Sequence, residues 1–232
     1  MYDDTITHCL TIGRRPDLLR RTLDSLGPLK AMQTLAINDF GDEETSAVLR
    51  ELCPNGRIVG PGHHLGHHPA IDAMYAEVKT PYIFHDEDDW GFERLDFLDD
   101  ALRLLQAESK ISVVCFRATG DMPLSDADRA KIVTEERAGI RYERLDALHE
   151  QWHGYTFNPH LARRSLWQSL GGYAKWEKER HLSRFLRKDG YYVAFMLPPA
   201  CRHIGDGRST IAKKPTAFKK FKNWLRGIKQ VG

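Results

Sequence analysis

The 232-residue sequence lacks the features that mark membrane-spanning, secreted or disulfide-bonded proteins. No apolar run approaches the roughly 20 residues that a helix needs to cross a bilayer. The first residues, MYDDTITHC, lack the basic and then apolar pattern of a signal peptide. The four cysteines are Cys9, Cys53, Cys115 and Cys201, and no two of them form a CxxC pair. We therefore expect buried free thiols and a cytoplasmic location.

Two common phosphate-binding signatures are also missing. There is no GxxxxGK[ST] loop, and GPGHHLG at 60–66 has three residues between its second and third glycines, where a dinucleotide fingerprint has two. A transition metal could be held by histidines at i and i+4 if they shared a helix face. The proline and glycine residues around them argue against a continuous helix, so we favour a polar substrate loop. These histidines are His63, His64, His67 and His68.

Charge is distributed unevenly along the chain. The formal net charge is +2, with 34 basic and 32 acidic residues, but 211–232 hold seven bases and no acid. The body is therefore slightly acidic and the tail strongly basic, which suggests two kinds of partner. Apolar residues recur through the tail at steps of three and four, which indicates a basic amphipathic helix. We expect it to bind an anionic membrane surface or to pack on the body, and we expect no nucleic-acid partner.

Short apolar runs alternate with amphipathic segments through the first half of the chain. This alternation predicts a Rossmann-like α/β fold with a mostly parallel sheet flanked by helices, and ligands bind such sheets at the carboxyl ends of the strands. The predicted strands are 6–12, 34–38, 57–59, 81–85 and 111–117, and the predicted helical segments are 15–26, 42–52, 68–78 and 93–107.

The pattern becomes irregular after residue 118. Helical patterns cover 161–170 and 178–190, and a strand pattern covers 191–197. We therefore divide the chain into a ligand-binding half at 1–118, a smaller second lobe at 119–210 and the basic tail at 211–232.

Four consecutive carboxylates, Asp86, Glu87, Asp88 and Asp89, follow an apolar run in YIFHDEDDW, residues 82–90. They could complement the dipole of a helix beginning near Gly91. One or two acids would be enough for that, and carboxylate oxygens are the ligands of Mg²⁺ and Mn²⁺. We therefore favour a divalent metal site over capping alone.

The chain holds three stretches, LTIGRRPDLLRRTLDSL, AINDFGDEETSAVL and YIFHDEDDW, that together resemble the motifs of family 2 glycosyltransferases over about residues 5–210. The first stretch is similar to the opening strand and helix of that family, and the second to its second strand. EDDW, at 87–90, resembles a variant of its metal-binding D-x-D element. GGYAKWEKERHLSRFLRKDGYYV and CRHIGDGRST resemble the later blocks.

The resemblance implies a GT-A fold with a smaller acceptor-binding lobe, and a metal-dependent, inverting glycosyltransferase. It implies Mn²⁺ or Mg²⁺ as cofactor and a nucleotide-sugar donor, with a UDP-sugar favoured. Gly13 replaces the family's asparagine, and Lys178 with Glu179 replaces an acidic pair. The implied nucleotide-sugar-binding residues are Thr11, Arg14, Asp39, Gly66, Glu87 and Asp88, the metal ligands are Asp89, Glu87 and His203, and the general base is Glu179, with Glu177 as a rival.

Several alternatives stay open at this point. Asp86 and Asp88 could form the metal register in place of Glu87 and Asp89, and Glu179 could be an exposed helical acid. The acceptor would be a hydroxyl of a cell-surface glycan or of a lipid-linked precursor at the inner face of the membrane. The alternative functions are a sugar-phosphate nucleotidyltransferase and a non-catalytic, membrane-associated scaffold.

Overall fold

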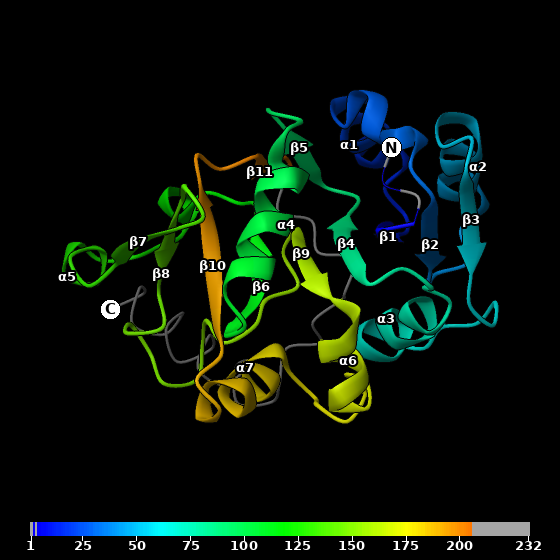
Figure 1. Cartoon of the computed structure of the whole chain (residues 1–232). Coiled ribbons are helices and arrows are strands. Elements are labelled where there is room, and N and C mark those ends of the chain that lie inside the picture. Colours follow the sequence, from blue (N-terminus) through cyan, green and yellow to red (C-terminus); the bar gives the residue numbers. More distant parts are fainter. Residues whose placement is uncertain (1, 3, 206–232) are drawn as a thin grey trace, which may run out of the picture.

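The computed structural model describes residues 2 and 4–205 (Figure 1). A nine-stranded sheet with the order β3-β2-β1-β4-β9-β6-β10-β8-β7 forms its centre. The basic tail predicted at 211–232 lies outside the described residues. The strands of this sheet are β1 (Ile6–Ile12), β2 (Thr34–Asn38), β3 (Gly56–Val59), β4 (Tyr82–Glu87), β6 (Ile111–Cys115), β7 (Val133–Arg137), β8 (Ile140–Arg144), β9 (His160–Arg163) and β10 (Tyr192–Leu197).

The sheet is mostly parallel because helices connect its first strands. β1 pairs in parallel with β2 and β4, β2 with β3, and β6 with β10. β9 and β8 run opposite to the other strands. The predicted α/β fold class is confirmed. The helices are α1 (Pro16–Ser25), α2 (Glu43–Leu52), α3 (His67–Ala76), α4 (Phe97–Ala107), α5 (Asp126–Arg129), α6 (Arg164–Leu170) and α7 (Glu179–Lys188), with 3₁₀ turns at Gly27–Ala31 and Thr119–Asp121.

Apolar side chains bury both faces of the sheet. Leu19 and Leu23 of α1, with residues of α2 and α4, pack on one face. Ile71 of α3 and Leu182 of α7, with residues of α6, pack on the other. Figure 1 shows α3, α6 and α7 side by side along the lower edge of the molecule. The four cysteines are free and buried, as predicted.

Two local predictions are wrong. The segment 161–170 is not one helix, because its first residues belong to β9, which lies between β4 and β6 and hydrogen-bonds to both. No helix begins near Gly91: Trp90–Phe92 form the short strand β5, which pairs antiparallel with β11 (Cys201–His203). The next helix begins only at Phe97. The acid cluster therefore precedes a strand and does not cap a helix.

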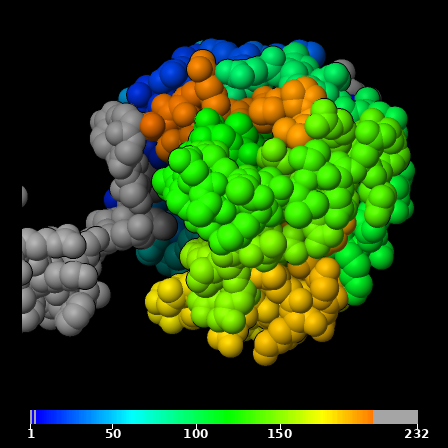
Figure 2. Space-filling model, turned by 90° about the vertical axis from the view of Figure 1, so that its left-hand side faces the viewer, coloured from blue at the N-terminus to red at the C-terminus, as the bar shows by residue number. Residues whose placement is uncertain are grey.

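The second half of the chain completes the sheet, and its strands β8 and β7 form one end of it. In Figure 2 the green segment that holds β7 and β8 lies between the yellow-orange α7 and the orange residues that end the described chain. Strands on both sides of residue 118 belong to the same sheet, and the division at that residue stays a prediction. Within the described part of the chain, we find no helix that is long and apolar enough to cross a membrane.

Candidate active site

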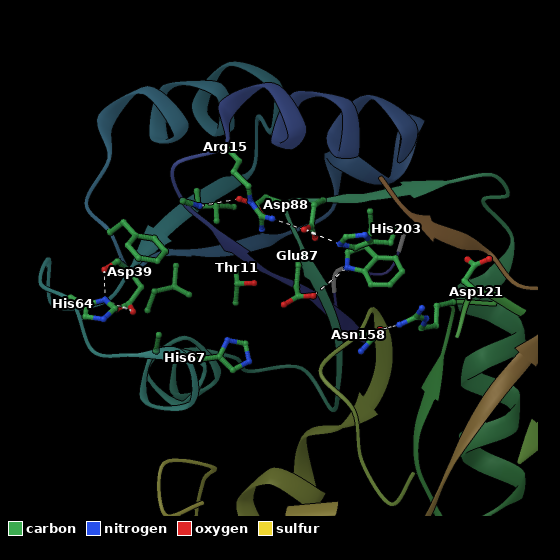
Figure 3. Close-up of a pocket in the computed structure, with 18 residues that line it drawn as sticks. Thr11, Arg15, Asp39, His64, His67, Glu87, Asp88, Asp121, Asn158 and His203 are labelled. Carbon is green, nitrogen blue, oxygen red and sulfur yellow. Dashed lines mark hydrogen bonds and ion pairs between the residues drawn. The ribbon is translucent and has the colours of Figure 1, made fainter. Parts of the chain in front are cut away.

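A cavity of about 680 Å³ opens at the carboxyl ends of β1, β2 and β4 (Figure 3). This volume lies in the range of small-molecule sites. In Figure 3, Asp39 and His64 lie at one end, Asp121 and Asn158 lie at the other, and Glu87 lies between them. Six of the residues predicted from the sequence line the cavity, namely Thr11, Asp39, Glu87, Asp88, Asp89 and His203.

Strand geometry separates the first two acids of the cluster. Side chains alternate across a strand, so Asp86 points to the face covered by α1, α2 and α4, while Glu87 points into the cavity. Asp86 is fully buried, with Oδ2 3.7 Å from Nε2 of His8. Burial raises the pKa of Asp86 well above its usual value and lowers that of His8 to about 3. Asp86 is therefore not among the residues that line the cavity.

Glu87 occupies the middle of the cavity. Its Oε2 accepts a hydrogen bond from Nε1 of Trp90 at 3.2 Å. Burial, and then the nearby charge of Asp89, raise its pKa to about 8. Glu87 is therefore largely protonated at neutral pH unless a positive charge binds beside it.

Arg15 offsets the charges of the last two acids. Its Nη1 donates to Oδ2 of Asp89 at 2.5 Å, and its Nη2 donates to Oδ1 of Asp88. The backbone N–H of Gly13 donates to the other oxygen of Asp88 at 3.1 Å. Burial still raises the pKa of Asp88 to about 6, although Arg15 opposes that rise. A guanidinium group thus bridges the two carboxylates at the cavity wall.

His203 reaches Asp89 because of the small second sheet. The pairing of β5 with β11 sets His203 opposite Trp90, and the backbone N–H of Ile204 donates to the carbonyl of Asp89 at 2.9 Å. Nε2 of His203 lies 3.1 Å from Oδ2 of Asp89. A Cβ atom on Gly205 would lie 2.9 Å from each of these two atoms. The glycine therefore leaves open the space in front of both.

These donors fit a divalent cation in part. Mg²⁺ and Mn²⁺ accept one or two carboxylates together with phosphate oxygens and water. Asp89 and His203 converge on the open space beside Gly205, and Glu87 lines the same cavity. In residues 2 and 4–205, no group of three or more His, Cys, Asp or Glu side chains is already arranged to hold a metal. Water or a bound substrate would therefore supply the remaining ligands of a cation here.

Asp39 holds the glycine-rich loop against the cavity. Its Oδ1 accepts the N–H of Leu65 at 2.6 Å, and its Oδ2 accepts the N–H of Gly66 at 2.9 Å. Oδ2 also lies 2.8 Å from Nδ1 of His64. Gly66 has φ 89°, which favours glycine, and α3 begins at the next residue. Asp39 and Gly66 are thus brought together, although Gly66 does not line the cavity.

Arg14 packs on a cavity residue without lining the cavity itself. Its φ is 60°, and its guanidinium lies 4.4 Å from the ring centroid of Phe40. The ring of His64 stacks on Phe40 at 5.6 Å between centroids. Phe40 and His64 line the cavity, whereas Arg14 does not.

The four histidines do not share a helix face, because α3 begins only at His67. Nδ1 of His68 lies 2.5 Å from the backbone carbonyl of Trp176. His67 lines the cavity, and burial lowers its pKa to about 4.

The two candidate bases differ in environment. Glu179 is the first residue of α7, and its Oε2 accepts the backbone N–H of Phe157 at 3.1 Å. Burial raises its pKa to about 7, while that hydrogen bond and the charge of Arg117 oppose the rise. Neither Glu179 nor Glu177 is a lining residue, but Asn158, next to Phe157, is. Glu177 is largely exposed, 3.7 Å from Nζ of Lys178.

Several residues that line the cavity were not predicted from the sequence. Nη1 of Arg117 donates to Oδ1 of Asn158 at 2.7 Å, and its guanidinium lies 5.4 Å from the ring of Trp90. Arg15 and Asp121 also line the cavity. The best available signal was the basic pair before Pro16. It did not reveal that the backbone turn at Arg14 sends the two side chains in different directions.

No family model and no curated protein matches the sequence. Solved structures do match. The mannosyltransferase PcManGT from Pyrobaculum calidifontis, in complex with GDP-Man and Mn²⁺, is 15% identical, with a TM-score of 0.64, over 90% of this chain and 59% of that one. TarS 1–349 from S. aureus is 12% identical, with a TM-score of 0.55, over 85% and 59%. Its complex with UDP-GlcNAc is 10% identical, with a TM-score of 0.55, over 88% and 62%.

These likenesses concern the fold. The chain spans about three fifths of the length of the solved structures it matches. The α/β architecture predicted from the sequence, of the GT-A type, is confirmed.

Proposed function

We propose that the chain transfers a sugar from a nucleotide-sugar to a hydroxyl group. The observation that carries this proposal is the convergence of acidic and basic groups at the carboxyl edge of a parallel sheet. Asp88 and Asp89 face Arg15 there, and His203 lies beside Asp89. Open α/β sheets bind their ligands at this edge. The solved structures with this fold include complexes with GDP-Man and UDP-GlcNAc, which supports a nucleotide-sugar donor.

We assign Mn²⁺ or Mg²⁺ as the cofactor, held by Asp89 and His203, with Glu87 nearby. When bound, such an ion acts as a Lewis acid that neutralises the leaving diphosphate. The Mn²⁺ complex of PcManGT supports this choice. An Asp89→Ala variant should lose nearly all turnover. Full activity of that variant would contradict the assignment.

We assign Glu179 as the general base. Its pKa of about 7 suits a group that accepts a proton near neutral pH. A single base opposite an activated leaving group implies one in-line displacement and therefore inversion at the anomeric carbon. Residues 119–210 would bind the acceptor and residues 1–118 the donor. The proposed acceptor is a cell-surface glycan or a lipid-linked precursor.

A thermal-shift screen tests the donor class. UDP, GDP and their sugars are added with and without Mn²⁺, and the unfolding temperature is recorded. Binding to the folded state raises that temperature. We expect one nucleoside diphosphate to raise it more with Mn²⁺ than without, UDP being the first choice. No shift with any of these ligands would contradict the proposal.

A second measurement separates an enzyme from a non-catalytic scaffold. The preferred nucleotide-sugar is incubated with the protein and Mn²⁺, and release of the nucleoside diphosphate is followed by chromatography. Slow hydrolysis in the absence of an acceptor is expected of an enzyme. Binding without any hydrolysis, with or without hydroxyl acceptors, would favour the scaffold.

A further inference from the structure

We propose that Arg15 is a resident counter-ion that the incoming cation displaces from Asp88 and Asp89, and that it then binds the donor's diphosphate. The inference rests on the proposed function, because it concerns the cation and diphosphate of that reaction. It adds a role for a residue that is not among the predicted site residues.

The geometry places Arg15 on the oxygen that a cation would need. Oδ2 of Asp89 lies 2.5 Å from Nη1 of Arg15 and 3.1 Å from Nε2 of His203. A cation held by Asp89 and His203 would share this oxygen with the guanidinium. Two positive charges at such close range repel strongly in a partly buried site. The cation and the guanidinium therefore exclude each other.

Arg15 stabilises the site when no substrate is bound. The side chains of Asp88 and Asp89 are only 2% and 8% exposed. Buried carboxylates without a partner are costly, and Arg15 supplies that partner. Nε of Arg15 is buried and has no hydrogen-bond partner in the described structure. The guanidinium is therefore held through its two Nη atoms only.

The cavity gives the displaced side chain a new partner. Arg15 lines the same cavity as the acids, and its side chain is 18% exposed. A guanidinium binds phosphate oxygens in a two-pronged arrangement. The diphosphate brings the negative charge that Arg15 loses when it leaves the acids. After the exchange, the metal ion pairs with Asp88 and Asp89, and Arg15 pairs with the diphosphate.

Manganese binding without nucleotide tests the first step. Free Mn²⁺ is measured by electron paramagnetic resonance during titration of the wild type, Arg15→Ala and Arg21→Ala. Arg21→Ala is the matched control, because it removes the same charge from the exposed side of α1. We expect Arg15→Ala to bind Mn²⁺ about tenfold more tightly than the wild type, because the guanidinium that competes with the metal ion for Asp89 is gone. The control should match the wild type.

Nucleotide binding tests the second step. In the presence of Mn²⁺, we expect Arg15→Ala to bind the preferred nucleoside diphosphate about tenfold more weakly in calorimetry. Arg15→Lys keeps the positive charge but lacks the two-pronged guanidinium, so its nucleotide affinity should lie between those of the wild type and Arg15→Ala. If circular dichroism shows that Arg15→Ala does not fold, Arg15→Lys replaces it in both titrations.

Two outcomes would overturn the inference. One is equal or weaker Mn²⁺ affinity in Arg15→Ala, and the other is unchanged nucleotide affinity. Failure of the proposed function looks different, because the wild type itself would then bind no nucleoside diphosphate. The Mn²⁺ titration needs no nucleotide and is decided separately.

Discussion

The four acids at 86–89 have different environments because β4 ends at Glu87, in the middle of the cluster. Asp86 is still within β4 and faces the core beside His8. Asp88 and Asp89 follow the strand, and both reach Arg15. The repulsion that four adjacent carboxylates suggest is thus relieved in three ways: by burial of Asp86 and Glu87 with raised pKa values, by Arg15, and by His203.

Replacement of Glu179 by glutamine tests the proposed base. We expect kcat to fall by about 10²- to 10⁴-fold, with donor affinity unchanged, because the amide cannot accept the proton. Initial rates and donor titrations measure the two effects. Glu177→Gln is the comparison. A loss of turnover in that variant, with Glu179→Gln still active, would transfer the role to Glu177.

The pH profile gives an independent check on the same residue. A base works in its deprotonated form, and the pKa of Glu179 is raised to about 7. We therefore expect kcat/KM of the wild type to rise with pH below about 7 and to level off above it. A profile that is flat from pH 5.5 to 8 would argue against Glu179.

At the scale of elements, the start of α2 joins two loops of the site. Asp42 is the N-cap of α2: its side chain accepts the N–H of Thr45 at 3.4 Å and the N–H of Arg14 at 2.7 Å. Burial raises the pKa of Asp42, but these hydrogen bonds outweigh it, and the net shift is downward. The cap therefore fixes the loop after β1 as well as the helix.

We expect Asp42→Ala to lower the free energy of unfolding by about 1 kcal/mol at pH 7. Because the folded pKa is depressed, the carboxylate's contribution is present above its unfolded pKa and is lost as pH falls through the folded value. The difference in the free energy of unfolding between the wild type and Asp42→Ala should therefore become smaller as the pH falls. Urea unfolding at several pH values measures this difference. Glu44→Ala, an exposed first-turn acid, should change stability by less than about 0.5 kcal/mol; an equal loss in both variants would contradict the capping role.

Apolar runs made most elements of the sheet predictable. The strands predicted at 6–12 and 34–38 match β1 and β2, and the strand predicted at 111–117 contains β6 at 111–115. The helix α1 begins at Pro16, as predicted. β9 was missed because HLAR, at 160–163, is short and runs directly into a helix. β7 and β8 were missed because VTEER and IRYER each hold three charged residues and no apolar run, although β8 lies inside the sheet between β10 and the edge strand β7.

The candidate site was predictable where it follows strand ends and less so where distant segments meet. Glu87 was found because the acid cluster follows an apolar strand whose carboxyl end lies at the ligand-binding edge of the sheet, and Thr11, on the neighbouring strand, was found through the family resemblance. Arg15 was missed because the conformation of a single turn decides which of two adjacent arginines faces the acids. Arg117 and Asn158 meet only through tertiary packing, and the sequence has no local pattern for that contact.

The whole molecule combines a slightly acidic body with a basic tail, and the tail lies outside the described residues. If the tail binds membranes, full-length protein should sediment with vesicles that contain anionic lipid. A truncation to 1–210 should stay in solution, because each base near such a surface contributes about 1 kcal/mol. Neutral vesicles serve as the control. Equal sedimentation of both proteins would exclude the tail as an anchor.

The place of β9 has a consequence for how the chain reaches its fold. β4 and β6 are separated in the sheet by a strand made from residues 160–163. A growing chain that has not reached those residues leaves both strands with an open edge, and such edges readily pair with other chains. Contacts between segments this far apart in sequence form slowly. The N-terminal half of the protein therefore depends on residues 160–163 of the C-terminal half to complete its sheet. We expect a fragment of residues 1–118 to aggregate when it is expressed alone.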